Sequence, residues 1–357
     1  MNVLFPFRGN TVGGSHISSM ELIKELSKLG INTEIAIHEK GPVVELLMEN
    51  NIPFEMINHK FLEAPGGLTA IVQLPRIKPL VGFLKTRQID IVHTNDGVMT
   101  HNWVPAARLA KKKSVVHVRR LWQPSRISDW LHLYGDHFIA NSNFVRSSIP
   151  QKALGRVTTV ANPIMQPIVS KANANRGKEI IVMVGSHTVQ KRPEIFIEAA
   201  RVVSMERPEA QFILIGRHTQ YTAHLRELVN KAGLNANFDF IEYTTKVANI
   251  IDGATLLVAP ALNEGHGRTL IEAMLLSTPV IASRSGGHAE IIEDGVNGKM
   301  FEPDNSAAMA ETIIDLLSDL EKIKTMVDVA KKFAVKNFAA DVHARAILKT
   351  YMDLVKE

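Results

Sequence analysis

Cysteine is absent from this chain of 357 residues. Its absence excludes a disulfide framework, a thiolate nucleophile, and zinc or iron–sulfur sites with cysteine ligands. Long apolar runs are also missing, since none approaches the roughly 20 residues that span a bilayer. Residues 1–7 lack the basic start and extended apolar core of a signal peptide. We therefore expect a cytoplasmic protein, either soluble or peripheral on the inner face of a membrane.

Acidic residues are scarce in the first half of the chain. Residues 1–160 contain 19 lysines and arginines against 12 aspartates and glutamates, whereas the remainder contains 22 against 24. The net charge of +5 therefore arises entirely in the first half. Such a basic surface suits anionic lipid, a phosphorylated substrate or nucleic acid. Nucleic acid ranks last, because no zinc-finger, RNP-like or helix-turn-helix pattern accompanies the charge.

Short apolar runs alternate with helical patterns along the chain, and they do so twice. The first series of predicted strands covers residues 3–7, 32–37, 89–94, 114–118 and 137–140. The second series covers residues 179–184, 211–215, 238–242, 256–259 and 280–282. Continuous Val, Ile and Leu runs between helices are typical of parallel sheets covered on both faces. We therefore predict an α/β protein with two Rossmann-like domains.

The predicted domain boundary lies in a linker at residues 162–178, where two prolines precede a polar stretch. We expect an N-terminal domain over residues 1–165 and a C-terminal domain over residues 166–341. A last helical pattern at about residues 342–357 is expected to pack back onto the first domain. Ligands of such sheets bind beyond the carboxyl ends of the strands, so two facing domains predict a central cleft.

In each predicted domain, a glycine-containing turn follows the first strand. Gly13 and Gly14 precede a helix, where close backbone approach and unpaired amides suit an anion. In the second domain Gly185 is followed by Lys191, a charge-assisted donor suited to a diphosphate. Each turn can also be interpreted as a simple tight turn or a solvated loop.

The most informative segment, residues 260–274, follows the strand at residues 256–259. Gly265 and Gly267 disfavour a helix before Arg268, which places Glu264 in a loop and Glu272 in the first turns of the next helix. The two carboxylates then flank amides at a helix start that are suited to an anion. The structural alternative is that Glu272 complements the helix dipole and Glu264 is an exposed loop residue.

These motifs together resemble the family-four glycosyltransferases, group 1 type, which have the GT-B fold and retain anomeric configuration. The paired glutamates with seven residues between them, Glu264 and Glu272, match the family's EGxGxxxxE setting. The run from Gly286 to Gly298 resembles its GGxxE…DGxNG run, and the Gly-Gly turn near the N-terminus matches as well. The similarity covers nearly the whole chain.

The resemblance implies a role for each matching residue. Glu264 would contact the transferred sugar near the reacting centre, and Glu272 would hold the ribose of a nucleotide-sugar donor, UDP being the first choice. The diphosphate would bind Lys191 and the backbone near Gly13, Gly14 and Gly185, together with Gly267, Arg268, Thr269 and Leu270. His266 occupies a position that is commonly aromatic and is expected near the donor sugar or packed in the structure. No Asp-x-Asp triplet is present, and the resemblance implies an enzyme without a metal or other cofactor.

The sequence departs from the family pattern at three positions, one of which is His266. Ser186 stands where many relatives have an arginine, so Arg192, Arg268 or an arginine of the first domain is expected to supply the missing charge. Asn95 stands where many relatives have a second histidine after a first-domain strand, and an amide cannot accept a proton at neutral pH. We predict a front-face retaining reaction, with domain closure to exclude water.

The acceptor is expected on the basic first domain. Arg119 and Arg120 follow a predicted strand, and with Asn95 they are candidate acceptor residues. Basic and apolar residues mix over residues 71–87, which suits an anionic membrane surface and a glycan or lipid-linked acceptor, as in cell-surface polysaccharide synthesis. The alternatives are a GT-B nucleotide-sugar epimerase and a noncatalytic sugar-nucleotide-binding protein. The donor base and sugar, the linkage and the oligomeric state stay open.

Overall fold

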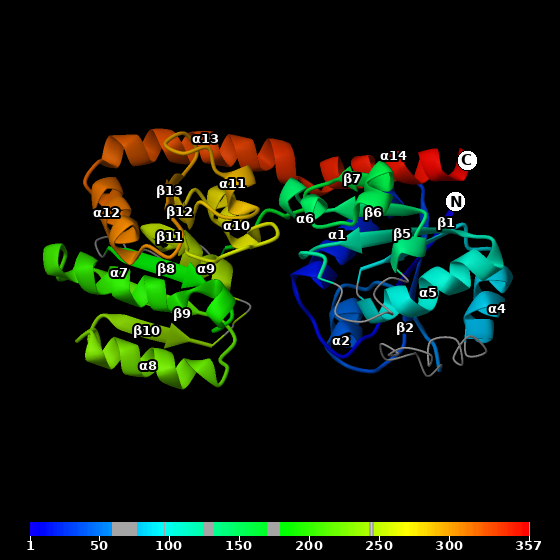
Figure 1. The fold of residues 1–357 in the computed structure, drawn as a ribbon, viewed down its shortest axis with the longest axis horizontal. Coiled ribbons are helices and arrows are strands. Elements are labelled where there is room, and N and C mark those ends of the chain that lie inside the picture. Colours follow the sequence, from blue (N-terminus) through cyan, green and yellow to red (C-terminus); the bar gives the residue numbers. More distant parts are fainter. Residues whose placement is uncertain are drawn as a thin grey trace. The chain divides into compact units, whose positions relative to one another are not determined.

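The computed structural model describes residues 1–58, 77–95, 97–123, 132–169, 179–242, 244 and 246–356. Residues 71–76 of the predicted basic segment and residues 170–178 of the predicted linker lie outside these ranges. The chain divides into two compact units: unit 1 consists of Met1–Pro163 and Ala340–Glu357, and unit 2 of Ile164–Ala339 (Figure 1). Both units are α/β with parallel sheets, which confirms the predicted fold class.

Unit 1 contains a parallel sheet of seven strands in the order β3-β2-β1-β4-β5-β6-β7. Its strands are β1 (Asn2–Phe7), β2 (Asn32–Ile37), β3 (Glu55–Met56), β4 (Ile91–Thr94), β5 (Lys113–Val118), β6 (His137–Ala140) and β7 (Val157–Thr159). Its helices are α1 (Gly14–Lys28), α2 (Pro42–Glu49), α4 (Lys78–Thr86), α5 (Gly97–Ala110), α6 (Asn143–Ser147), the 3₁₀ helix η3 (Gln151–Arg156) and α14 (Ala340–Lys356).

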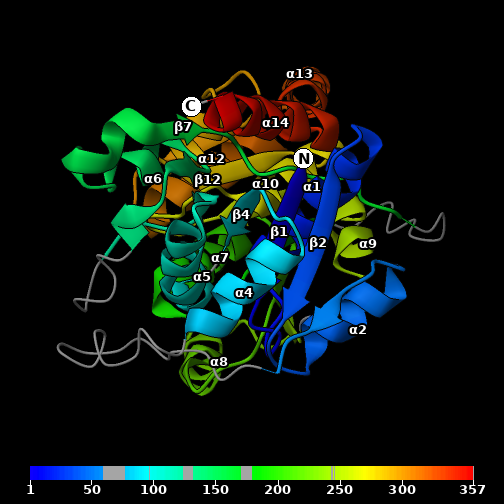
Figure 2. The same ribbon diagram turned by 90° about the vertical axis from the view of Figure 1, so that its right-hand side faces the viewer.

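The two faces of β1 explain why this sheet is covered on both sides. Val3 and Phe5 belong to a buried cluster with side chains of α1, α2 and α14. Leu4, between them, belongs to a cluster with α4 and α5. Successive side chains of a strand point to opposite faces, so one apolar run fills two helical layers. Figure 2 shows α14 beside α1 in this unit.

Unit 2 contains a parallel sheet of six strands in the order β10-β9-β8-β11-β12-β13. Its strands are β8 (Ile180–Val184), β9 (Gln211–Ile215), β10 (Phe238–Ile241), β11 (Leu256–Ala259), β12 (Val280–Ser283) and β13 (Lys299–Phe301). Its helices are η4 (Val189–Lys191), α7 (Pro193–Glu206), α8 (Tyr221–Lys231), α9 (Val247–Asp252), α10 (Arg268–Leu275), α11 (His288–Ile291), α12 (Ser306–Leu317) and α13 (Leu320–Phe338).

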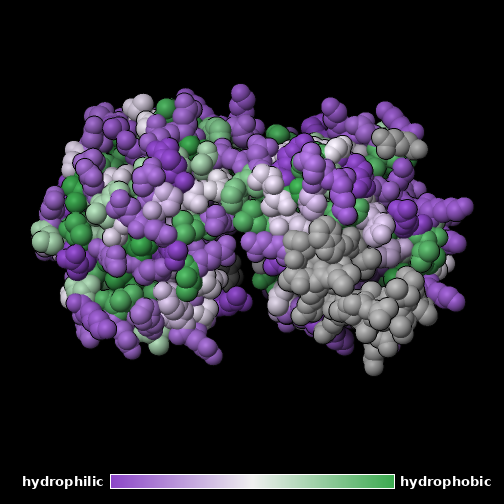
Figure 3. Space-filling model, viewed as in Figure 1, coloured by the Kyte–Doolittle hydropathy of each residue, from purple (hydrophilic) through white to green (hydrophobic). Residues whose placement is uncertain are grey.

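The order of the strands in unit 2 reverses direction between β8 and β11. Such a switch point leaves a crevice beyond the carboxyl ends of the two strands, where ligands of open parallel sheets bind. Polar and apolar residues are interspersed on the face of unit 2 visible in Figure 3. Among the described helices, none combines the length and the apolar character required to cross a bilayer.

A buried histidine network joins α14 to the sheet of unit 1. His93 of β4 is fully buried, with Nδ1 lying 2.5 Å from the Tyr351 hydroxyl and Nε2 lying 3.2 Å from His117 Nδ1. Both contacts are satisfied when Tyr351 donates to a neutral His93 and Nε2–H donates to His117. Burial, with added repulsion from Arg119 and His343, holds the pKa of His93 well below its usual value.

This depressed pKa predicts acid sensitivity of unit 1. The unfolded chain takes up a proton below about pH 6.5 and the folded chain does not, so the stabilisation is complete above pH 6.5 and is lost as the pH falls below it. All three tryptophans lie between residues 103 and 130, so their fluorescence follows the unfolding of unit 1. We expect the midpoint temperature of unit 1 unfolding to decrease as the pH is lowered from 7.5 to 5. The fall should be smaller in His93→Gln and unchanged in His224→Gln, whose side chain is exposed; equal falls in all three proteins would contradict this origin.

Candidate functional site

A cavity of about 80 Å³ lies at the switch point of unit 2. Its walls come from the ends of β8 and β11, from the loop after β11 and from the start of α10. The lining residues are Met183, Val184, Lys191, Ala259, Pro260, Ala261, Glu264, Gly267, Arg268, Thr269 and His288. Five of the residues predicted from the sequence to bind a donor therefore line one cavity, although they come from two separate segments of the chain.

Lys191 and Glu264 form the central ion pair of the cavity. Lys191 Nζ lies 2.5 Å from Glu264 Oε2. The two segments are held together by a backbone hydrogen bond 3.1 Å long from the Leu262 N–H to the Gln190 carbonyl. Burial by itself would raise the pKa of Glu264, but the charge and hydrogen bond of Lys191 outweigh it and lower that pKa below its usual value. Glu264 is therefore a carboxylate at neutral pH.

A second ion pair lies at the start of α10. Arg268 Nε donates to Glu272 Oε1 over 2.7 Å, and both side chains are 23% exposed. Their spacing of four residues places them on the same helix face, with Glu272 one turn behind the cavity wall. Arg192 is placed differently, since it pairs with Asp304 and Glu194 and does not line the cavity.

Gly267 is the residue before α10 and has φ 66°, a left-handed conformation that favours glycine. A side chain there would also collide with the ring of His288, since a Cβ atom would lie 2.8 Å from its Cδ2. Arg268 and Thr269 then begin the helix, where backbone N–H groups have no carbonyl of the preceding turn to bind. This geometry suits an anion at the cavity wall.

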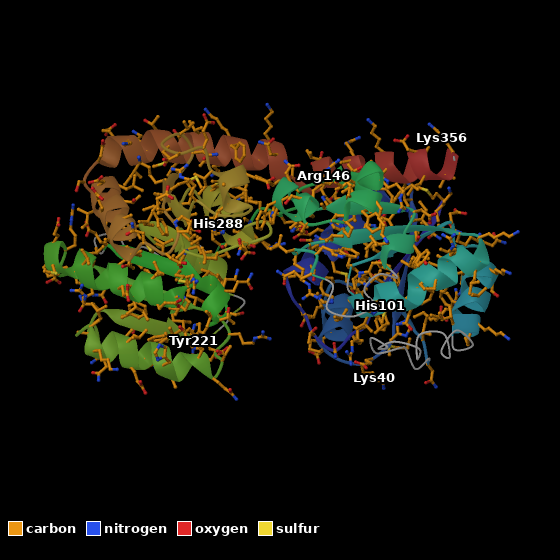
Figure 4. All side chains as sticks on the ribbon, in the orientation of Figure 1. Lys40, His101, Arg146, Tyr221, His288 and Lys356 are labelled. Atoms are coloured by element: carbon orange, nitrogen blue, oxygen red, sulfur yellow. The ribbon has the colours of Figure 1, made fainter. Side chains whose placement is uncertain are left out.

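His288 lines the cavity but received no individual role in the sequence-based prediction. It is buried at the start of α11, in the interior of unit 2 (Figure 4). Burial lowers its pKa to about 4, with Lys191 adding to the effect and Glu264 and Ser283 opposing it. His288 is therefore neutral at pH 7, and its ring forms a wall for Gly267. The only sequence signal for it was its position directly after Gly286 and Gly287.

Other predicted donor residues of unit 2 lie near the cavity but do not line it. Gly185 follows β8 and packs against the stem of Lys191, where a Cβ atom would lie 3.4 Å from Lys191 Cγ. His266 is 5% exposed and packs edge-on against Phe338, with ring centroids 5.6 Å apart. Leu270 differs from the expectation of an available amide, because its N–H donates to the Gly267 carbonyl over 3.1 Å.

The predicted residues of unit 1 lie at the carboxyl ends of its central strands. Gly13 precedes α1 and donates its N–H to His16 Nδ1 over 3.2 Å, and Gly14 is the first residue of α1. Arg119 follows β5 and donates to Asn95 Oδ1 over 3.1 Å, to Asn162 Oδ1 and to His117 Nδ1. Arg120 is exposed. Asn95 and Arg119 are thus neighbours in one polar network of unit 1.

Metal ligands were not expected from the sequence. Within the ranges that the structure describes, no three His, Asp or Glu side chains come close enough together to hold a metal ion. The positive charge at the cavity of unit 2 comes instead from Lys191 and Arg268.

Comparisons with known proteins identify two adjoining family matches. Residues 12–164 match "Glycosyltransferase Family 4", and residues 165–333 match "Glycosyl transferases group 1". An uncharacterized glycosyltransferase of Methanocaldococcus jannaschii is 28% identical over 225 residues, covering 61% of this chain and 60% of that protein. The lipopolysaccharide core biosynthesis mannosyltransferase LpsB of Rhizobium meliloti is 28% identical over 203 residues, covering 54% and 58%. The chain thus spans about 60% of the length of the curated relatives it matches.

Solved structures show the same fold over the full chain. Anabaena HepE in complex with UDP has a TM-score of 0.86 at 19% identity, and the match covers 99% of this chain and 100% of that one. The complex of the same protein with UDP-glucose has a TM-score of 0.83 at 20% identity, again covering 99% and 100%. At this level of identity the likeness establishes the fold.

The contact between Gly287 and the Glu264 loop makes this position a test of the site. The Gly287 N–H donates to the Glu264 carbonyl over 2.7 Å, and a Cβ atom at Gly287 would lie 2.5 Å from the Gly265 carbonyl oxygen. We expect Gly287→Ala to displace the loop, to lower the free energy of unfolding by about 1–3 kcal/mol and to weaken the binding of inorganic pyrophosphate. Calorimetry and thermal unfolding measure both effects.

Gly82→Ala is the matched control, because a Cβ atom there meets nothing within 4 Å and the residue lies inside α4. Wild-type pyrophosphate affinity in Gly287→Ala would show that the loop does not depend on this contact.

Proposed function

Because the two family matches together cover residues 12–333, this chain belongs to the group 1 glycosyltransferases of family four, and we propose that it transfers a sugar from a nucleotide diphosphate donor. The acceptor is a hydroxyl group of a glycan or of a lipid-linked molecule. The transfer retains the anomeric configuration of the sugar. The observation that carries the proposal is the cavity where Lys191, Glu264 and the start of α10 meet. Its cations, amides and carboxylates match the chemical groups of such a donor.

The diphosphate of the donor is assigned to Lys191, Arg268 and the backbone at Thr269. Charge-assisted donors and a helix N-terminus both favour phosphate oxygens. Glu272, one turn farther along α10, is assigned to the ribose hydroxyls, since an ionised carboxylate accepts hydrogen bonds from a diol. Glu264 is assigned to hydroxyls of the transferred sugar. UDP is the first choice of nucleotide, supported by the HepE complexes with UDP and UDP-glucose.

The proposed reaction is a front-face substitution. The acceptor oxygen forms a bond to the anomeric carbon, the bond from that carbon to the diphosphate oxygen breaks, and the proton of the acceptor hydroxyl moves to a phosphate oxygen. Lys191 and the amides of α10 stabilise the charge that develops on the leaving diphosphate. Glu264 is paired with a cation in the same cavity, an arrangement that suits sugar binding better than nucleophilic attack. We propose that these groups act without a divalent metal.

Two substitutions in the cavity test the donor assignment. In a buffer containing EDTA, we expect slow hydrolysis of a matching nucleotide sugar by the wild type. Glu264→Gln should lower this rate by roughly 100-fold or more, as expected for loss of a group that acts near the reacting centre. Glu272→Ala should weaken binding of the nucleotide roughly 10- to 100-fold, because hydrogen bonds to a charged group are lost. Calorimetry with UDP, GDP and ADP donors identifies the base.

Three outcomes of this experiment would contradict parts of the proposal. Binding of a nucleotide sugar without any turnover would favour the noncatalytic sugar-nucleotide-binding protein. Accumulation of an epimer in a donor-only incubation would favour an epimerase. Activity that disappears in EDTA and returns with Mg²⁺ would contradict metal independence.

The acceptor is assigned to unit 1, where the basic excess lies. On α4, Lys78 and Lys85 are both exposed, whereas Leu80 and Leu84 are buried. The two lysines are two helical turns apart and therefore share one outward face. Arg120 is also exposed, at the end of β5. This charge distribution supports a phosphorylated or lipid-linked acceptor presented at an anionic membrane surface.

A vesicle-binding assay tests the membrane part of this assignment. Each lysine near an anionic surface contributes about 1 kcal/mol, so the double variant Lys78→Glu, Lys85→Glu should bind phosphatidylserine vesicles at least roughly tenfold more weakly than the wild type. The control is Lys324→Glu, Lys332→Glu on α13 of unit 2, where both side chains are exposed. Absence of vesicle binding by the wild type, or an equal loss in both variants, would contradict an α4-directed membrane surface.

A further inference from the structure

Two cation–carboxylate pairs place three of their four side chains in the wall of the unit 2 cavity. Lys191 pairs with Glu264 at 2.5 Å, and Arg268 pairs with Glu272 at 2.7 Å. Lys191, Glu264 and Arg268 line the cavity, and Glu272 lies one helical turn behind. The four side chains are 23–30% exposed, so solvent screens these pairs only in part. The cavity and the helical turn behind it therefore hold two positive and two negative charges that neutralise each other.

This balance matters for an incoming anion. A phosphate group that approaches Lys191 or Arg268 must compete with a carboxylate already in contact, and it also meets the negative charge of that carboxylate. A diphosphate alone would leave Glu264 and Glu272 without their cations in a partly desolvated site, which is unfavourable. The cost is offset when the same ligand brings hydroxyl groups that donate to both carboxylates.

We propose that in the pairs Lys191–Glu264 and Arg268–Glu272 each side chain takes the place of a donor group for its partner, an inference that rests on the proposed function. Donor binding then breaks both pairs together and replaces them with contacts to the donor. Phosphate oxygens replace the carboxylate oxygens on Lys191 and Arg268. Sugar hydroxyls then replace Lys191 on Glu264, and ribose hydroxyls replace Arg268 on Glu272. Arg268 thereby becomes the second side-chain cation for the diphosphate and a specificity-determining residue. Each charge in the cavity is paired before and after the exchange.

The exchange gives the site a means of telling donor from product. A nucleotide sugar carries hydroxyl groups at both ends of its diphosphate and satisfies both carboxylates. The nucleoside diphosphate that remains after transfer satisfies only Glu272, so Glu264 again competes for Lys191 and favours release. Inorganic pyrophosphate satisfies neither carboxylate. The affinity order is therefore nucleotide sugar, then nucleoside diphosphate, then pyrophosphate.

Pyrophosphate is the sharpest probe, because it requires only the cations. We expect Glu264→Gln and Glu272→Gln each to bind pyrophosphate about two- to fivefold more tightly than the wild type, the effect of removing one partly exposed competing charge. The same variants should bind UDP-glucose, or the matching donor from the GDP and ADP series, more weakly. Arg268→Met should weaken both ligands. Isothermal titration calorimetry without divalent cations measures all of these affinities.

The matched control is Glu179→Gln. Glu179 pairs with Arg207 at 3.0 Å, and the two side chains are 34% and 30% exposed, close to the values at the cavity. This pair lies at the amino end of β8, whereas the cavity lies at the carboxyl end of the same strand. Loss of the pair should therefore leave both affinities at the wild-type value. Circular dichroism and thermal unfolding establish that each variant is folded.

The outcomes separate the exchange from the function on which it rests. Tighter pyrophosphate binding together with weaker donor binding in both Glu→Gln variants would support the exchange. Unchanged or weaker pyrophosphate binding in both variants, with normal donor binding by the wild type, would overturn the exchange and leave the proposed function intact. Failure of the wild type to bind any nucleotide sugar would overturn the proposed function itself.

Discussion

The contact between Lys191 and Glu264 is the interaction on which the candidate site depends. It requires the end of β8 and the loop after β11 to lie side by side, which the parallel pairing of β8 with β11 provides. The Leu262–Gln190 backbone hydrogen bond also joins the two loops. Without these constraints a lysine and a glutamate would be two solvated side chains. With them, opposite charges share a small cavity beside a helix N-terminus.

Two glycines without side chains allow the loops of this site to approach each other closely. Gly267 permits the left-handed backbone that starts α10 directly at the cavity wall, and Gly287 lets another loop approach the backbone at Gly265. His288 fills the remaining space behind Gly267 and stays neutral because it is buried. Backbone contacts and packing therefore hold the loops of the candidate site in place. The charged side chains are the groups that change partners in the proposed exchange.

Much of the fold could be predicted from hydrophobic pattern, because a strand covered on both faces must be apolar along its length. The central strands β1, β8 and β11 follow this rule, and they lie within one residue of their predicted bounds. The edge strands β3, β7 and β13 are only two or three residues long and carry too few residues to show a period. The long helix α13 was not predicted as a separate element; its buried side chains, Met326, Ala330, Ala334 and Phe338, form one narrow stripe among exposed polar residues.

The candidate site divides in the same way. By itself, the sequence determined the residue types and their local geometry: the spacing of Glu264 and Glu272 and the helix start at Arg268. Only the tertiary structure decided that Lys191 pairs with Glu264, that Arg268 rather than Arg192 faces the cavity, and that His288 forms its wall. Lys191 and Glu264 are 73 residues apart. Contacts over such separations depend on the order and register of the strands between them, which local sequence patterns do not specify.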